Sequence, residues 1–426
     1  MADEWGDFEL ALTQAPTVSV RLNDKTTLPQ FADAEPVPWC DTGRYLAERP
    51  NFTRDPLFHA GAYYVQEASS MFLWQVLEKF VDKNAKILDM CAAPGGKSTL
   101  MAHYLDGGVL VANEFVRTRA YVLAENVQKW GSPHVVVTNN VPCDFADFNA
   151  VFDAVLVDAP CSGEGMFRKD TTAVTEWSAA NVHNCVLRQR NILTSAWQSL
   201  KTDGILIYST CTYNRLENEE NVQWLCQRFG AEILRIPLDE AWQVTETAEG
   251  YHFYPHKTRG EGLFLAVLRK TAAENHAKIR GKGAPKTLAS SAFADYLKNA
   301  DEYALFVFQN CNFAFLKHHA DLLQACLNRL NVLHFGVPLA EQKGKDLVPQ
   351  TGLALSKAFN LPTFASAAVD LETALRFLRC EAIALPDAPK GFLAVKYRNV
   401  PIGWVKNVGN RCNNLYPAPW RIRMAL

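Results

Sequence analysis

Hydrophobic residues along the chain fall into short, nearly continuous runs that are separated by longer amphipathic stretches. Each run is too short for a helix and ends at turn residues, which predicts a buried strand. The predicted strands are residues 86–90, 108–114, 134–138, 152–158 and 205–209. The stretches between and after them predict helices at about 97–105, 117–130, 178–200 and 218–229. Strands that are apolar on both faces and alternate with helices predict a parallel sheet covered on both sides.

Two more apolar runs, residues 231–236 and 263–268, follow with only a loop expected between them. They predict an antiparallel pair at the edge of the sheet. The predicted fold class is therefore α/β, a doubly wound, mostly parallel, Rossmann-like sheet of the layout usual in S-adenosylmethionine (SAM) methyltransferases. Ligands of such sheets bind beyond the carboxyl ends of the strands. The residues expected there are 91–97, Glu114, Asn139, Asn140, 158–161, Thr210 and Cys211.

Changes in composition divide the chain into four predicted parts. Residues 1–56 form a small α+β unit, and residues 57–270 hold the sheet. Residues 271–287 are polar and basic and predict a linker. Residues 288–426 contain frequent glycine and proline and predict a β-rich extension of one or two small units, with a boundary near 335–345.

The composition limits the cellular setting. A net charge of -2 over 426 residues gives no overall basic field, so any nucleic-acid binding must depend on local patches. The first residues are acidic and do not resemble a signal peptide, and no apolar run is long enough to span a membrane. Eleven cysteines without a close pair favour a reducing cytoplasm over a disulfide framework or a zinc site.

The loop from Cys91 to Lys97 contains small residues between a predicted strand and a predicted helix. This arrangement lets a ligand approach backbone N–H groups and a helix N-terminus. A phosphate-binding P-loop needs glycine at the position of Cys91, and the dinucleotide-binding glycine pattern is absent. A SAM-binding loop and an ordinary tight turn both remain open on this segment alone.

Cys161 and Cys211 each follow the end of a predicted strand, and the two strands are neighbours in this architecture. Two buried structural cysteines are one interpretation, and an active pair is the other. Methylation at carbon 5 of a pyrimidine needs such a pair. A thiolate adds to carbon 6, a carboxyl such as Asp158 shares a proton at N3, and a second thiol serves as the base that removes the carbon-5 proton.

Five motifs closely resemble, in the same order, those of the Nol/Nop/Sun family of RNA 5-methylcytosine methyltransferases. The resemblance covers roughly residues 16–270 and implies SAM as the cofactor. It also implies Cys211 as the nucleophile, Cys161 as the thiol that assists product release, and Asp158 as a catalytic residue. DNA cytosine-5 methyltransferases instead attack with the Pro-Cys thiol. The motifs are residues 64–69, 91–98, 158–165, 208–212 with 217–222, and 255–264.

The same resemblance implies a set of cofactor contacts. Glu114 would bind the ribose hydroxyls, and Arg119 either orients Glu114 or is a surface charge. Family members often carry an acid near the adenine at the end of the third strand, where this chain has Asn139 and Asn140, so we assign that contact to Asn140. The other implied contacts are Asp158 and the loop of Cys91, Ala92, Ala93, Pro94, Gly95, Gly96 and Lys97.

Two segments allow competing interpretations. Residues 220–222 imitate a Glu-Asn-Val triplet of DNA enzymes but come after Cys211, so we interpret them as helix surface with Asn218 as the helix cap. The tail resembles the bacterial RsmF-type ribosomal-RNA branch of the family, whose extension is thought to bind RNA. Trp404 and Trp420, interleaved with basic residues, either stack on unpaired bases or fill the core of a small domain.

Together these features predict a cytoplasmic, SAM-dependent RNA methyltransferase that converts cytosine to 5-methylcytosine. The resemblance of the tail favours ribosomal RNA or a ribosomal subunit as the partner. The target base must be unpaired or flipped out of its stack to expose carbon 6. A transfer-RNA cytosine-5 methyltransferase and a non-catalytic, RNA-binding ribosome-assembly factor are the alternatives. The sequence does not indicate an oligomeric state.

Overall fold

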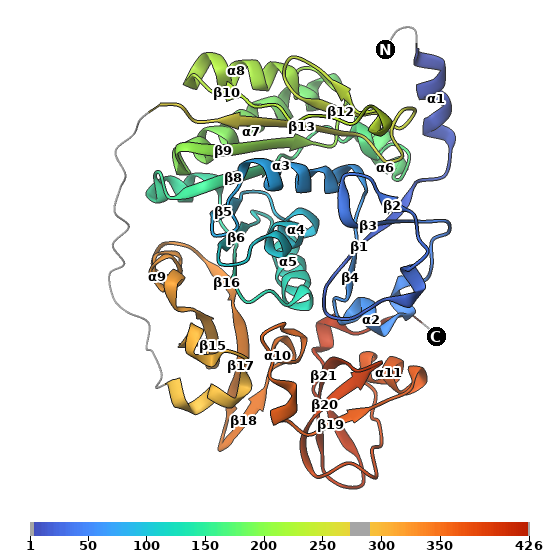
Figure 1. Cartoon of the computed structure of the whole chain (residues 1–426), viewed down its shortest axis with the longest axis vertical. Helices are drawn as coiled ribbons and strands as arrows, with labels where there is room; N and C mark the ends of the chain where they lie inside the picture. The colour runs from blue at the N-terminus through green and yellow to red at the C-terminus, as the bar shows by residue number, and fades with distance from the viewer. Residues whose placement is uncertain (1–3, 273–289, 425–426) are drawn as a thin grey trace.

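The computed structural model describes residues 4–272 and 290–424, so the predicted linker lies almost wholly outside the described residues. A ten-stranded sheet runs through the molecule in the order β11-β12-β13-β9-β8-β5-β6-β7-β16, with β10 paired to β13 (Figure 1). Its five central strands are parallel, as the sequence predicted. They are β5 (Lys86–Asp89), β6 (Val109–Asn113), β7 (Val135–Thr138), β8 (Phe152–Asp158) and β9 (Leu200–Thr210).

Helices cover both faces of the sheet, which confirms the doubly wound α/β prediction. Ile87 in β5 packs among residues of α3, α4 and α5, whereas its neighbour Leu88 packs among residues of α7, α8 and α9. Alternate strand residues therefore enter opposite cores. The helices are α3 (Leu73–Phe80), α4 (Gly96–Tyr104), α5 (Arg117–Trp130), α6 (Thr171–Glu176), α7 (Ala179–Ser199), α8 (Glu219–Phe229) and α9 (Ala320–Arg329).

The predicted antiparallel edge is confirmed, but it is wider than expected. β13 (Leu263–Arg269) pairs antiparallel with β9, and the short β10 (Glu232–Ile233) pairs with β13. The intervening segment, predicted as a loop, contains β11 (Thr245–Glu246) and β12 (Tyr251–Phe253), which extend the sheet. β9 also begins earlier than predicted, because Leu200 already pairs with Phe152.

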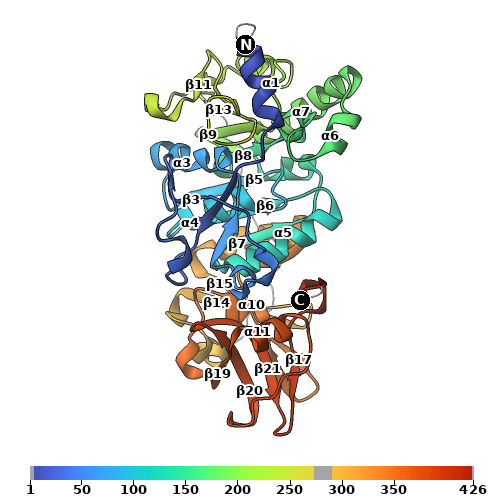
Figure 2. The ribbon, with the colours of Figure 1, turned by 90° about the vertical axis from the view of Figure 1, so that its right-hand side faces the viewer.

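The N-terminal part forms a separate four-stranded sheet that packs beside α4 and α5 (Figure 2). Buried Arg21 fixes this contact, because its guanidinium lies 4.2 Å from the Trp130 ring centre and donates to Thr99 Oγ1 at 2.6 Å. The elements here are α1 (Trp5–Thr13), β1 (Val18–Leu22), β2 (Pro36–Val37), β3 (Cys40–Leu46), α2 (Pro56–His59) and β4 (Tyr63–Val65).

The C-terminal part contains two further four-stranded sheets and also reaches into the central sheet. β16 (Val332–Phe335) pairs antiparallel with β7, which no local pattern had indicated. The remaining elements are β14 (Tyr303–Phe308), β15 (Cys311–Leu316), β17 (Val337–Lys343), β18 (Asp346–Pro349), α10 (Thr351–Leu355), β19 (Ser366–Ala368), α11 (Leu371–Leu378), β20 (Gly391–Tyr397), β21 (Val400–Asn407) and β22 (Cys412–Asn414).

The structure decides one open alternative and corrects two expectations at the start of α8. Trp404 is fully buried and donates its indole N–H to the Gln350 carbonyl, so it belongs to the core and not to a stacking surface. Asn221 and Val222, predicted as helix surface, are also fully buried. Asn218 precedes α8, but its side chain does not cap the helix and instead accepts from Thr210 Oγ1 at 2.6 Å.

Candidate active site

The two singled-out cysteines meet at the carboxyl ends of β8 and β9. Asp158 ends β8 and pairs in register with Ser209 of β9, which places both strand ends at one level. Cys161 and Cys211 follow within three residues of these ends, and their Sγ atoms are 3.1 Å apart. The fold therefore brings together two free thiols that are 50 residues apart in the chain.

The loops that carry the thiols are bonded to each other on several sides. The N–H of Gly165 donates to the Cys211 carbonyl at 2.9 Å, and the hydroxyls of Ser162 and Thr212 are 2.9 Å apart. Glu164 also accepts from the N–H of Tyr213 at 3.1 Å. These bonds hold the pair of sulfurs in one arrangement.

The two thiols differ in how readily they ionise. The hydrogen bond from Cys161 lowers the pKa of Cys211 below the usual thiol value, although burial opposes this change. The same bond raises the pKa of Cys161 well above that value, and burial adds to the increase. Cys211 therefore ionises more readily than Cys161, which is the order that a Cys211 nucleophile requires.

Lys97 and Asp158 form an ion pair beside the thiols. Lys97 Nζ lies 2.8 Å from Asp158 Oδ1, which also accepts from Ser209 Oγ at 2.7 Å. Burial alone would lower the pKa of Lys97, but Asp158 raises it above its usual value, so Lys97 stays charged. Burial raises the pKa of the neighbouring Asp89 to about 7.

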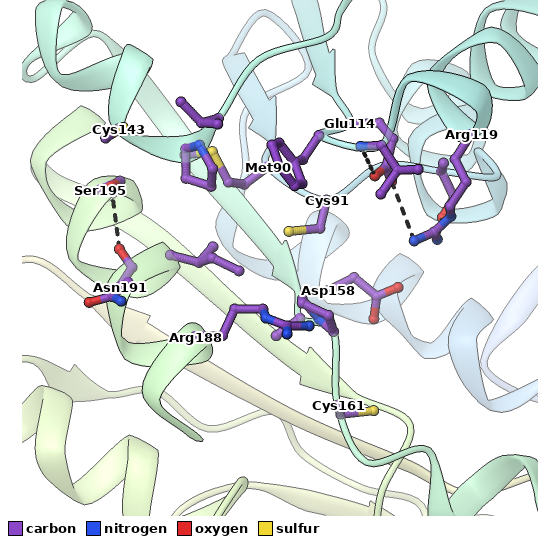
Figure 3. Close-up of a pocket in the computed structure, with 18 of the residues that line it drawn as sticks. Met90, Cys91, Glu114, Arg119, Cys143, Asp158, Cys161, Arg188, Asn191 and Ser195 are labelled. Carbon is purple, nitrogen blue, oxygen red and sulfur yellow. Dashed lines mark hydrogen bonds and ion pairs between the residues drawn. The ribbon is translucent and has the colours of Figure 1, made fainter. Parts of the chain in front are cut away.

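A cavity of about 720 Å³ opens beside this cluster at the carboxyl edge of the sheet (Figure 3). Predicted site residues from four strand ends, those of β5, β6, β8 and β9, line it together, which confirms the expectation that they share one edge. Phe115, Val116, Val141 and Pro142 add apolar walls. The predicted residues that line the cavity are Cys91, Ala93, Lys97, Glu114, Arg119, Asp158, Cys161 and Cys211.

Glu114 and Arg119 lie together in this cavity. Glu114 is buried and accepts from the N–H of Val116 at 2.9 Å. Arg119 lies 3.7 Å from Glu114 and donates to the Ala93 carbonyl at 2.7 Å, so it connects the acid with the small-residue loop. Asn140 does not line the cavity, because its side chain bonds to Asp144 and to the N–H of Asn331. The adenine contact of Asn140 stays a prediction.

A second cavity, of about 1060 Å³, approaches the same cluster from the N-terminal sheet. It shares Cys91, Ala93, Lys97, Asp158 and Cys211 with the first cavity. Its other walls include Ala92, Pro94, Gly96, Tyr64, Gln66, Arg49 and Lys169. Gly95 lines neither cavity, but its φ of +112° at the start of α4 suits glycine. Cys211 is thus accessible from two separate spaces.

Sequence reasoning missed the wall that α7 contributes. Arg188, Asn191, Ile192 and Ser195 line the first cavity, and Figure 3 shows Arg188 extending toward the end of β8. The strand-end rule does not find them, because they come from the side of a helix. Phe115 and Val116 directly follow a strand end, so the same rule contained a signal for them.

Neither a metal site nor a membrane span is found in residues 4–272 and 290–424. No group of three or more histidine, cysteine or acidic side chains there is placed to hold a metal ion. No helix in this part of the chain is long and apolar enough to cross a membrane.

Comparison with known proteins identifies the family. Residues 76–269 match the model of the 16S rRNA methyltransferases RsmB/F. Residues 1–68 match the N-terminal domain of 16S rRNA methyltransferase RsmF, and residues 364–422 match the RsmF PUA domain. Ribosomal RNA small subunit methyltransferase F of Photobacterium profundum is 34% identical over 90% of this chain and 84% of its own length. The chain belongs to the RsmF family.

Another RsmF relative agrees with this assignment, and solved methyltransferase structures share the fold. The relative from Escherichia coli O9:H4 is 32% identical over 96% of this chain and 91% of its own length. A methyltransferase homolog from Pyrococcus horikoshii is 26% identical, with a TM-score of 0.54 over 63% of this chain and 91% of that one. NSun6 from the same organism, solved with SFG, is 20% identical with a TM-score of 0.53 over 63% of this chain and 95% of that one, and supports the fold.

Membership in the RsmF family confirms the resemblance drawn from the sequence motifs, including the bacterial branch indicated by the tail. The N-terminal part and residues 364–422 of the C-terminal part also match domains of RsmF. The roles of individual site residues stay predictions, which the next section develops from the geometry.

Proposed function

We propose that this protein transfers a methyl group from SAM to carbon 5 of a cytosine in small-subunit ribosomal RNA. One observation carries the proposal: two thiols are in contact, and Cys211, whose pKa is the lower of the two, lines both cavities. The RsmF relatives, named for ribosomal RNA of the small subunit, support the substrate class and a cytoplasmic setting.

The first cavity fits SAM by its hydrogen-bonding groups and its apolar walls. The Glu114 carboxylate suits the two ribose hydroxyls, and Phe115, Val141 and Pro142 offer apolar surfaces to the adenine. The loop of small residues from Cys91 lets the methionine end approach the backbone. Bound SAM supplies the electrophilic methyl group. The second cavity, lined partly by the N-terminal sheet, then admits the target base.

The residues at the junction account for each step on the base. The Cys211 thiolate forms a bond to carbon 6, and the electron pair of the 5,6 double bond makes carbon 5 the nucleophile for the methyl group. As the ring becomes electron-rich, N3 takes up a proton that Asp158, held by Lys97 and Ser209, relays from the Lys97 ammonium, and N3 returns this proton when the double bond forms again. Cys161 then takes the carbon-5 proton, the double bond forms again, and Cys211 leaves as a thiolate. Because Cys161 begins as a thiol, it first gives its proton to solvent in the cavity and then acts as the thiolate base.

We further propose that the regions flanking the sheet, residues 1–56 and 288–426, bind the RNA on either side of the target. A basic patch of the predicted linker at 271–287 would add to this surface. The matches to the RsmF N-terminal and PUA domains support the division.

The roles of the cysteines are tested by trapping the covalent adduct. Cys161→Ala protein is expressed in the organism that naturally makes the protein, so that its native RNA is present. It is purified under denaturing conditions, and the attached RNA is sequenced. We expect one adducted cytosine in small-subunit ribosomal RNA, and no adduct when Cys211→Ala is added. Cys211→Ala alone should abolish methyl transfer.

Three outcomes would contradict the proposal. Methyl transfer by Cys211→Ala would show that Cys211 is not the nucleophile. An adduct with transfer RNA would show that the proposed substrate class is wrong. SAM binding without methyl transfer to any RNA would favour a non-catalytic assembly factor.

A further inference from the structure

Glu217 is a buried acid that the steps above do not use. It lies six residues after Cys211, in the loop before α8, and its side chain is fully buried. Its Oε2 accepts from the N–H of Ser162 at 3.0 Å and from Gln189 Nε2 at 2.7 Å. Glu217, which lies in the segment that carries Cys211, therefore holds Ser162, the residue next to Cys161.

The surroundings of Glu217 fix its position. Its backbone carbonyl accepts from the Tyr208 hydroxyl at 2.5 Å and from Asn221 Nδ2 at 3.0 Å. Gln189 donates from α7 to Pro160 as well, at 3.1 Å, so the same amide supports both the acid and the Cys161 loop. Oε1 of Glu217 is buried without a hydrogen-bond partner in the described part of the chain.

We propose that Glu217 is a positioning residue for product release, because it holds Cys161 at the Cys211 sulfur. This inference rests on the proposed function, in which Cys161 removes the carbon-5 proton. Cys211 does not depend on Glu217 in the same way, because it directly follows β9, which is paired on both sides with β8 and β13. Loss of the Glu217 carboxylate should therefore affect release more than formation of the bond between Cys211 and carbon 6.

The test compares two glutamates that are two residues apart. Glu217→Gln should behave as a partial form of Cys161→Ala, with a covalent enzyme–RNA adduct that breaks down about ten-fold more slowly than in the unchanged protein. Glu219→Gln is the matched control, because Glu219 is also buried and also has an unpartnered oxygen, but it bonds to His252 at 2.9 Å and not to the Cys161 loop. The control should accumulate no adduct.

The assay follows adduct breakdown after the full-length protein is mixed with SAM and small-subunit ribosomal RNA, and it is resolved on denaturing gels. In the Cys161→Ala background, adding Glu217→Gln should not slow breakdown further, since Glu217 acts through Cys161. If the Glu217→Gln protein does not fold, Gln189→Met, which removes the amide that supports Glu217, should give the same adduct.

The outcomes separate the two proposals. An adduct with Cys161→Ala but none with Glu217→Gln or Gln189→Met overturns the role of Glu217 and leaves the proposed function in place. Equal slowing with Glu219→Gln, or further slowing in the Cys161→Ala background, also overturns it. No adduct even with Cys161→Ala overturns the cysteine roles themselves, and the Glu217 proposal fails with them.

Discussion

The hydrogen bond between the two thiols determines which one ionises more readily. The hydrogen bond with Cys161 lowers the pKa of Cys211 and lets its thiolate form at lower pH. Cys161→Ala should raise that pKa and slow alkylation of Cys211 by iodoacetamide near neutral pH. Cys161→Ser keeps a donor and should largely restore the rate. Peptide mass spectrometry across a pH series measures this, and identical pH profiles for all three proteins would contradict it.

Individual residues at the strand ends could be predicted, whereas residues on helix sides could not. Cys161, Cys211 and Asp158 follow from the rule that parallel strands end at one edge. Arg188 has no such signal, because its place depends on how α7 packs against the sheet. The burial of Trp404 was left open for a different reason. A Trp beside basic residues suits a buried core as well as an RNA-binding surface.

At the scale of elements, β16 connects the C-terminal part with β7, at the side of the sheet that carries Glu114. Asn139 lies at this connection: its N–H donates to Asn331, just before β16, and its side chain donates to the carbonyls of Glu114 and Phe115 at 2.7 and 2.8 Å. The amide of Asn139 therefore supports the turn that carries Glu114.

Asn139→Ala should raise the KM for SAM, because two hydrogen bonds of about 1 kcal/mol each no longer hold the Glu114 turn. We expect an increase of about five- to ten-fold with kcat nearly unchanged, the pattern of lost ground-state binding. Asn360→Ala is the control, since its side-chain amide also donates two hydrogen bonds, to the Asp295 carbonyl and to Thr363 Oγ1, but lines neither cavity. Steady-state kinetics with varied SAM decide the matter, and an unchanged KM for Asn139→Ala would count against it.

The strength of the local pattern explains which elements were predicted. The five central strands are continuous apolar runs, and this pattern requires burial on both faces. β11 and β16 have two and four residues, and their pairing depends on the strand they meet. Short edge strands of this kind carry little periodicity, so the sequence indicated a loop for β11 and gave no partner for β16.

At the scale of the whole molecule, Lys25 joins three parts of the chain that no sequence pattern connects. Its Nζ donates to the carbonyls of Ala60, Lys129 and Leu355, at 2.8, 2.5 and 2.6 Å, which belong to the N-terminal part, α5 and the end of α10. A lysine in a charged turn gives no indication of such distant partners. One ammonium group thus bonds across the junction between the sheet domain and both of its neighbours.

Lys25→Met should lower the free energy of unfolding by about 3 kcal/mol or more, because it leaves three carbonyls without their donor at a cost of about 1 kcal/mol or more each. The loss should also loosen the C-terminal part, since Leu355 is one of the three partners. Lys298→Met is the matched control, because Lys298 is exposed and its Nζ donates to one carbonyl, that of Lys357 at 3.2 Å, in the same C-terminal part. Urea denaturation should show a lower midpoint for Lys25→Met alone. Equal midpoints for the two variants would mean that the three bonds do not hold the parts together.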